Sequence, residues 1–327
     1  MEPTDVGDRI ERASSMLGSL ARRDVPLAPL TTYRVGGSAA LMVRPRSVVD
    51  LAVIATVVAE TELPTLIVGR GSNLLIADAG YNGIAIMLDE MVDDRTHGHR
   101  VDGTQVTARA SLALPQLARR LVADRLAGFE WAVGVPGSVG GAVRMNAGGH
   151  GSDMRECLIE AWIFDLRTNC SAWVATEQLG MRFRGSDLAS HQIVVEARIQ
   201  LTHGDRETSQ QLIDEVVRWR REKQPGGQNA GSVFVNPIPG ELAAGELIDR
   251  VGLRGHRLGS ASVSSKHANF IQASEGGSSD DVVALIDFVR RRVAEETGFE
   301  LRSEVRLIGF DDAPIDDEVG ILIGAGQ

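Results

Sequence analysis

The chain has 327 residues and a formal net charge of −10, with 43% hydrophobic, 24% charged and only 4% aromatic residues. This length predicts two or three domains, each able to bury a core. The acidic balance and the few aromatic side chains argue against nucleic-acid binding, which needs clustered positive charge or stacking surfaces. We find no secretory leader, no run of apolar residues long enough to cross a membrane and only two cysteines without metal-ligand spacing. We therefore expect a cytoplasmic protein without a metal site.

The first hundred residues alternate between helical and strand patterns. Residues 7–22 and 47–60 carry apolar side chains at helical spacing, whereas short apolar runs at 39–43, 65–68 and 84–88 predict buried strands. The middle of the chain is richer in strands. Its pattern predicts one main helix at 112–126 and strands at 106–109, 158–165, 171–175 and 192–201.

The last third has a helical pattern of its own. Helices are predicted at 208–223 and 243–251, the second followed by Gly252, the glycine expected just after a helix end. Ser278, three residues before Asp281, is expected to cap a third helix that presents one apolar face, and residues 305–308 predict a closing strand. We therefore predict an α+β fold. Its expected parts are a lead-in at 1–29, two subdomains at 30–103 and 104–221, a C-terminal domain at 222–310 and an acidic tail at 311–327.

Glycine is unusually frequent, with 36 residues, and it gathers in two segments, 69–71 and 134–151. Glycine lets a backbone approach a ligand closely, and consecutive N–H groups in such loops can bind phosphate oxygens. The first segment follows a predicted strand, but Leu74 stands where a dinucleotide fingerprint of the G-x-G-x-x-G type requires glycine. No nucleotide-binding G-x-x-x-x-G-K-[ST] motif is present either. The two segments predict a phosphate-bearing cofactor held in a different loop architecture.

Local chemistry alone does not single out a catalytic residue. Ser232 lacks the G-x-S-x-G pattern of a serine nucleophile, so its local context is typical of a hydroxyl that bonds to the backbone. His267 stands alone, which is more typical of a structural histidine than of a catalytic one.

Seven segments taken together, in order, resemble the UDP-N-acetylenolpyruvoylglucosamine reductase family. They span roughly residues 25–310 and are Thr31–Gly37 (TTYRVGG), Gly69–Leu75 (GRGSNLL), Gly134–Ala142 (GVPGSVGGA), Arg144–Gly148 (RMNAG), Asn229–Phe234 (NAGSVF), Ala261–Phe270 (ASVSSKHANF) and Leu301–Gly309 (LRSEVRLIG).

The resemblance implies a fold, cofactors and a reaction. Residues 30–221 would form two subdomains of the vanillyl-alcohol-oxidase (PCMH) type of FAD-binding fold, and residues 222–310 a substrate-binding α+β domain. FAD would be bound without a covalent link, and NADPH would be the hydride source. The family reduces an enolpyruvyl ether on a UDP-sugar to give UDP-N-acetylmuramate for peptidoglycan. Hydride reaches the β-carbon through the flavin, and a proton is added at the α-carbon.

The resemblance also assigns residues. Ser232 matches the proton donor, Arg184 the catalytic arginine and Glu304 the catalytic glutamate, whose proton-donating role suggests a raised pKa. Lys223 and Asn236 match substrate-diphosphate contacts, although Lys223 could equally be a solvated cation at a helix end. The positions that correspond to FAD contacts are Tyr33, Arg34, Gly69, Arg70, Gly71, Ser72, Asn73, Leu74, Gly134, Pro136, Gly137, Ser138, Gly140, Gly141, Asn146 and Gly148.

Three departures from the family pattern lie beside the site. Val235 stands where a lysine or polar residue is common, and Phe183 replaces the tyrosine that commonly precedes the arginine. The stretch between Pro237 and Ala244 is short, as in the family's shorter subtype. Two alternatives remain: another FAD oxidoreductase of this fold that acts on a sugar or hydroxy acid, and a nucleotide-sugar-binding protein without catalysis. We expect a monomer.

Overall fold

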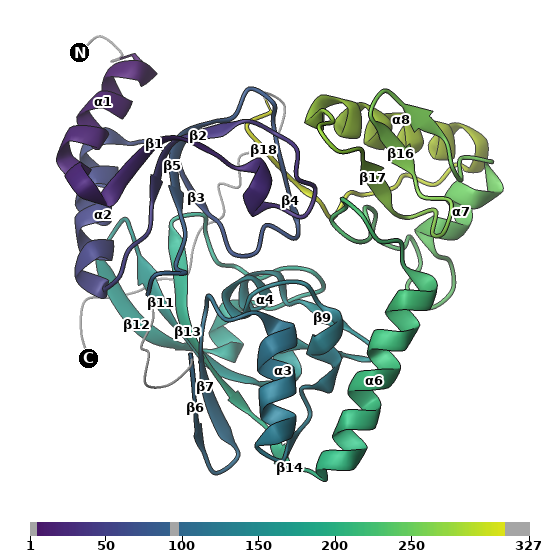
Figure 1. Cartoon of the computed structure of the whole chain (residues 1–327), viewed down its shortest axis with the longest axis horizontal. Coiled ribbons are helices and arrows are strands. Elements are labelled where there is room, and N and C mark those ends of the chain that lie inside the picture. Colours follow the sequence, from purple (N-terminus) through teal and green to yellow (C-terminus); the bar gives the residue numbers. More distant parts are fainter. Residues whose placement is uncertain (1–4, 92–97, 311–327) are drawn as a thin grey trace.

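The computed structural model describes residues 5–91 and 98–310 (Figure 1). The predicted tail at 311–327 lies outside the described residues. The helices are α1 (Val6–Leu17), α2 (Val48–Thr61), α3 (Leu114–Ala123), α4 (Val139–Met145), α5 (Met154–Cys157), α6 (Arg206–Lys223), α7 (Ala244–Arg250), α8 (Ser279–Thr297) and the short 3₁₀ turns η1 (Gly18–Leu20), η2 (Ala28–Leu30), η3 (Glu130–Gly134) and η4 (Thr176–Leu179).

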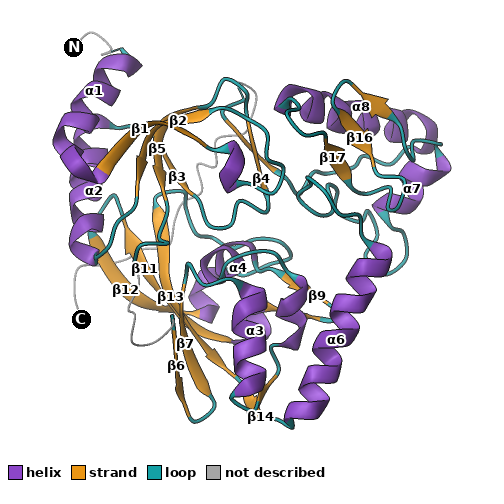
Figure 2. Cartoon of the chain, in the orientation of Figure 1, coloured by secondary structure: helices purple, strands orange, loops and turns teal. Residues whose placement is uncertain are grey.

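The strands are distributed over three larger sheets and several two-stranded pairs (Figure 2). They are β1 (Ala21–Pro26), β2 (Ser38–Val43), β3 (Thr65–Ile67), β4 (Leu74–Ile76), β5 (Tyr81–Ile86), β6 (His99–Asp102), β7 (Gln105–Arg109), β8 (Leu126–Ala127), β9 (Gly148–Gly149), β10 (Ser152–Asp153), β11 (Leu158–Asp165), β12 (Cys170–Ala175), β13 (Gln192–Gln200), β14 (Thr202–His203), β15 (Arg257–Leu258), β16 (Ala261–Val263), β17 (Ile271–Ala273) and β18 (Arg306–Ile308).

The first sheet has the order β1-β2-β5-β3, and α1 and α2 pack beside it. Strands β2, β5 and β3 run parallel, joined in part by α2, whose first turn carries a capping box between Ser47 and Asp50. The prediction of a helix over 7–22 is wrong at its end. The helix stops at Leu17, before Gly18 with φ 53°, and residues 21–26 form the antiparallel edge strand β1. The arginines of β1 are exposed, so the sequence of β1 lacks the apolar pattern of a buried strand.

The second sheet is antiparallel, with the order β12-β11-β13-β7-β6. The predicted strands of the middle segment are confirmed, and the predicted helix there is the shorter α3, which begins after Ala113. The two larger sheets share one hydrophobic core, to which α2, β2 and β5 contribute from one side and α3, β7, β11 and β13 from the other. A cofactor held between these sheets would therefore lie on a rigid support.

The third sheet, β15-β16-β17, packs against α7 and α8 around a core of its own. The predicted apolar face of α8 is confirmed, because Val282, Leu285, Val289 and Val293 are all buried. The glycine after α7, Gly252, has φ 72° and ends that helix as predicted. Within the described ranges, none of the helices combines the length and the apolarity that crossing a bilayer requires.

Two connections tie this third unit to the N-terminal part of the chain, called the first unit below, which carries the first sheet. β18 runs parallel to β4, with Arg306 opposite Leu74 and Ile308 opposite Ile76, so the last strand of the described chain lies beside the first unit (Figure 1). Tyr33 and Leu75 also enter the core of the third unit. The junction between the two is therefore built from both backbone pairing and apolar packing.

Asp78 caps α8 from outside that unit. Its carboxylate accepts hydrogen bonds from the Ser278 hydroxyl at 2.6 Å and from the backbone N–H groups of Ser279 and Asp280. The predicted cap at Ser278 is also confirmed, since its hydroxyl accepts from Asp280 and Asp281. The Asp281 carboxylate turns to Ser260 instead of closing a capping box. Partial burial pushes the pKa of Asp78 upward, but the hydrogen bonds outweigh it and hold the pKa below its usual value.

Replacing Asp78 by alanine is expected to lower the free energy of unfolding by about 1 kcal/mol, the typical effect of losing a helix cap. Because folding lowers the pKa of Asp78, this contribution is present at neutral pH and fades as the carboxylate is protonated below about pH 4. Urea unfolding at pH 7 and at pH 3.5 measures both, with Glu275→Ala, an exposed carboxylate nearby, as the control. Equal midpoints for Asp78→Ala and wild type at pH 7 would refute the capping role.

Candidate active site

A cavity of about 180 Å³ opens where the loop after β3 meets the start of α4. Residues that directly follow β5 and β7 line it, together with residues of β13. Five of the residues assigned to cofactor contacts also line it: Gly69, Arg70, Ser138, Gly140 and Gly141. The cavity thus lies between the first and second sheets, and the two glycine-rich segments of the sequence meet in it. These segments are more than 60 residues apart in the chain, and only the fold brings them together.

The loop from Gly69 to Asn73 has the properties of an anion-binding loop. Among the hydrogen bonds of the described residues, none uses an N–H group of residues 69–73 as its donor. Gly71 has φ 58°, and a Cβ there would lie 2.2 Å from the Leu30 carbonyl oxygen, so only glycine fits. Directly beside Gly69, the Ser138 hydroxyl accepts from the N–H of Gly141 and caps α4. Free backbone donors on a glycine-shaped loop suit a diphosphate.

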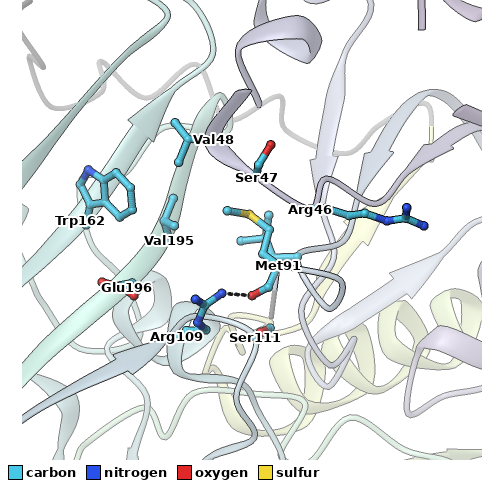
Figure 3. A pocket seen from close by; sticks show the side chains of 10 residues that line it. Arg46, Ser47, Val48, Met91, Arg109, Ser111, Trp162, Val195 and Glu196 are labelled. Carbon is cyan, nitrogen blue, oxygen red and sulfur yellow. Dashed lines mark hydrogen bonds between the residues drawn. The ribbon is translucent and has the colours of Figure 1, made fainter. Parts of the chain in front are cut away.

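A second cavity of about 210 Å³ adjoins the first and shares Leu88 and Ser111 with it. Figure 3 shows Arg109 reaching the backbone carbonyl of Met91 on one side, with Trp162 on the β11 side. The three residues assigned to catalysis line neither cavity.

Arg184 is presented by a tight turn with an uncommon backbone. The N–H of Arg182 bonds to the carbonyl of Gly185 at 2.9 Å, and the N–H of Gly185 bonds back to Arg182 at 3.1 Å. Arg184 itself has φ 56°, the left-handed region that favours glycine. The buried Asn146 anchors the turn through a 3.2 Å bond from its side-chain amide to the Arg182 carbonyl. A glycine would form this turn more easily than arginine does. A non-glycine residue held in such a backbone conformation is characteristic of functional positions.

Backbone strain at Arg184 leads to a prediction about stability. Arg184→Gly and Arg184→Ala both remove the guanidinium, but only glycine relieves the left-handed backbone. We expect the glycine variant to exceed the alanine variant in free energy of unfolding by about 1 kcal/mol. Guanidinium chloride denaturation of the two variants side by side measures the difference. An alanine variant as stable as the glycine variant would mean that the turn carries no strain.

The Arg184 guanidinium pairs with Glu304. Its Nε lies 3.2 Å from Glu304 Oε2, although the two residues are 120 positions apart in sequence. The guanidinium carbon also lies 5.1 Å from the centre of the exposed Phe183 ring. Burial raises the pKa of Glu304, and the nearby charges of Arg184 and Arg302 only partly oppose this. The raised pKa agrees with the expectation for a carboxyl that must hold a proton.

Ser232 precedes a short segment that pairs with the Glu304 segment. The N–H of Glu304 donates to the Val233 carbonyl at 2.8 Å, and the N–H of Val235 donates to the Arg302 carbonyl at 2.9 Å. Ser232 is half-buried, and among the described residues its hydroxyl has no hydrogen-bond partner. The hydroxyl is therefore free to interact with a ligand, in contrast to the backbone-bonded serine that local sequence suggested.

Asn73 links the Gly69–Asn73 loop to this cluster. Its side-chain amide donates to the Glu304 carbonyl at 2.9 Å, and its own carbonyl accepts from the N–H of Arg306 at 2.9 Å. The loop that begins at the cavity with Gly69 thus ends against the segment that carries Glu304. The fold brings Ser232, Arg184 and Glu304 together at the far end of this loop.

Other assigned residues lie elsewhere. Tyr33 is fully buried in the core of the third unit, whereas Arg34 and Lys223 are exposed. Asn236 accepts a hydrogen bond from the N–H of Ala244 at the start of α7. Leu74 begins β4, while Gly148 lies in β9 opposite Asp153. The other assigned residues lie in the two loops beside the first cavity or at the ends of these loops: Ser72, Gly134, Pro136 and Gly137.

Sequence reasoning missed two residues that hold the site. Asn269 bonds to the backbone of Phe234, and Arg144 donates to the carbonyls of Leu188, Ala189 and Gln192. Both residues lie inside the quoted motifs RMNAG and KHANF. Nothing in their spacing distinguishes a side chain that binds backbone from one that binds a ligand.

Comparison with known proteins identifies relatives over nearly the whole chain. Residues 39–165 match the family model of an FAD binding domain, and residues 222–308 match the model of the UDP-N-acetylenolpyruvoylglucosamine reductase C-terminal domain. A UDP-N-acetylenolpyruvoylglucosamine reductase from Heliobacterium modesticaldum is 41% identical, with 89% of this chain and 91% of that protein covered. One from Bacillus subtilis is 38% identical, with 87% and 92% covered.

A solved structure gives the same result. The crystal structure of the reductase from Thermus caldophilus has a TM-score of 0.74 and 32% identity, with 88% of this chain and 99% of that chain covered. The predicted α+β fold, an FAD-binding part followed by a C-terminal domain, is confirmed, and the predicted FAD cofactor agrees with it. Given matches of this identity along almost the full length, this chain belongs to the UDP-N-acetylenolpyruvoylglucosamine reductase family.

Proposed function

We propose that this protein reduces the enolpyruvyl group of UDP-N-acetylglucosamine enolpyruvate to give UDP-N-acetylmuramate, with FAD as cofactor and NADPH as hydride source. The observation that carries the proposal is the arrangement around Glu304. Its carboxylate pairs with Arg184, and its N–H donates to the carbonyl of the residue after Ser232. Its carbonyl accepts from the Asn73 side chain of the Gly69–Asn73 loop. One residue thus joins the three assigned catalytic positions to the expected cofactor site.

The residues of the first cavity fit FAD. The N–H groups of Gly69 to Asn73 face no protein acceptor among the described residues and would bind the diphosphate, with Ser138 and Gly140 lining the same cavity. When bound, FAD accepts hydride from NADPH and supplies it to the β-carbon of the enolpyruvyl group. Neither a histidine nor a cysteine occurs in this loop, which supports non-covalent binding.

The protein's own residues would handle charge and the proton. As the β-carbon becomes saturated, negative charge develops on the substrate carboxylate and the α-carbon. The Arg184 guanidinium and a protonated Glu304, fixed against each other before the reaction, would stabilise that charge. The Ser232 hydroxyl would then release its proton to the α-carbon, which is basic enough to accept it from a weak acid.

The remaining assignments are also proposals. Lys223 lies exposed at the end of α6, where its ammonium could reach a diphosphate, and Asn236 keeps its amide nitrogen available while its oxygen binds Ala244. The exposed Phe183 contributes its ring to Arg184 and offers no hydroxyl to the substrate. We propose a cytoplasmic monomer that acts on a small UDP-sugar.

An anaerobic experiment tests the reaction. The purified protein should release a flavin when it is denatured, the flavin should bleach with NADPH, and the enolpyruvyl UDP-sugar should restore its absorbance. Reduced flavin that this substrate does not reoxidise would contradict the proposal. Reoxidation by a sugar lactone or a keto acid would favour another oxidoreductase, and a protein that binds the UDP-sugar without either half-reaction would be a binding protein.

A further inference from the structure

The segment that carries Ser232 is held by a side chain from another loop. Residues 264–270 connect β16 and β17, and Asn269, only 4% exposed, points from this loop to the serine segment. Its Oδ1 accepts from the N–H of Phe234 at 2.9 Å, and its Nδ2 donates to the Phe234 carbonyl at 2.8 Å. Its backbone carbonyl also accepts from the N–H of Val233 at 2.8 Å. An amide side chain has the donor and acceptor of a peptide group, so Asn269 takes the place of a neighbouring strand.

The opposite edge of the same segment pairs with the Glu304 segment. There the Val233 carbonyl accepts from Glu304, and the N–H of Val235 donates to Arg302. The N–H and the carbonyl of Val233 and of Phe234 are therefore all hydrogen-bonded. For Phe234, both bonds go to the side chain of Asn269. Asn269 and the Glu304 segment clamp the serine segment between them.

The other side of Ser232 lacks such an anchor. Gly231, with φ 82°, bonds through its N–H to the Asn229 side chain within the same loop, and no atom lies within 4 Å of where its Cβ would be. The position of the Ser232 hydroxyl is thus set from its C-terminal side, where Asn269 supplies three of the hydrogen bonds.

We propose that Asn269 is a positioning residue that holds the Ser232 hydroxyl in place for proton transfer to the substrate α-carbon. The inference rests on the proposed function. Asn269 touches no reacting atom and acts through Phe234 and Val233, so its loss shifts the hydroxyl without removing it. A shift of about 1 Å in a reacting group can slow a reaction by about 10².

Stopped-flow measurements of the two half-reactions test this role in the full-length, flavin-bound protein. Asn269→Ala removes both side-chain bonds, whereas Asn269→Asp keeps the size and the acceptor but loses the donor to the Phe234 carbonyl. We expect both variants to retain the wild-type rate of flavin reduction by NADPH. Reoxidation by the enolpyruvyl UDP-sugar should slow by about 10 to 10². The control is Ser264→Ala, a buried residue of the same loop whose hydroxyl accepts from the backbone N–H groups of Lys266 and His267.

Two comparisons separate positioning from stability. Ser264→Ala should lower the unfolding temperature without slowing reoxidation. In a Ser232→Ala background, Asn269→Asp should cause little further loss, because the hydroxyl that it positions is gone. Equal slowing of both half-reactions, unchanged reoxidation, or full additivity with Ser232→Ala would each overturn the proposal. Failure of wild-type protein to reduce the substrate would instead refute the proposed function.

Discussion

Replacing Ser232 by alanine is expected to leave flavin reduction by NADPH unchanged and to slow reduction of the enolpyruvyl substrate by about 10²–10⁴, the range for loss of a general acid. The hydroxyl is half-buried, has no partner among the described residues and follows Gly231, so its removal breaks no hydrogen bond that holds the fold. An alanine at position 232 also fits beside the next residue, the buried Val233. The variant should therefore unfold at the wild-type temperature.

Anaerobic stopped-flow absorbance of the flavin separates the two half-reactions of this variant. Ser265→Ala, an exposed serine of the same unit, is a matched control and should behave as wild type in both. If Ser232→Ala slowed the two half-reactions equally, or slowed only the reaction with NADPH, the serine would not be the proton donor.

Glu304→Gln is expected to slow substrate reduction by about 10²–10³, the usual effect of removing one group that stabilises developing charge. Glutamine keeps the size and a donor N–H, but it cannot share a proton with the substrate. The Arg184 guanidinium loses its ionic partner and remains one-third exposed, so solvent can compensate for part of that loss. Flavin reduction by NADPH should be unaffected, and single-turnover rates at saturating substrate measure the difference.

The same substitution has an opposite effect on stability. Folding raises the pKa of Glu304, so the ionised carboxylate is disfavoured in the folded state at neutral pH. Glu304→Gln should therefore raise the unfolding temperature at pH 8. As the pH falls through the raised pKa, the wild type takes up its proton and regains stability, and the gap should close near pH 4.5. A gap that widens on acidification would show that Glu304 has a lowered pKa instead.

Periodicity predicted much of the secondary structure because the buried faces of α2 and α8 and the strands of the second sheet are long and strongly apolar. It failed for short or exposed elements. β1 carries three consecutive charged side chains at a sheet edge, and β16 and β17 have only three residues each. Such segments become strands through their partners, and a local pattern does not contain that information.

The candidate site depended more on resemblance than on local chemistry. The glycine clusters predicted a phosphate loop from physical reasoning, and the structure places both beside one cavity. In contrast, no local rule connects Arg184 with Glu304 or Asn73 with Glu304, which are 120 and 231 residues apart. The positioning role of Asn269 was invisible because an asparagine that replaces a strand has the same sequence context as one in a turn.

The parallel pairing of β4 with β18 has a consequence for how the protein is made. β4 is complete after residue 76, but its partner, Arg306–Ile308, is near the end of the chain. During synthesis, the edge of β4 therefore stays without its partner until residues 306–308, about 230 residues later, have left the ribosome. An unpaired edge can recruit strands of other chains. Glu304 arrives with the same segment. A chain cut short before residue 304 would have the Gly69–Asn73 loop without the carboxyl group assigned to catalysis, so the proposed reaction requires translation to pass this residue.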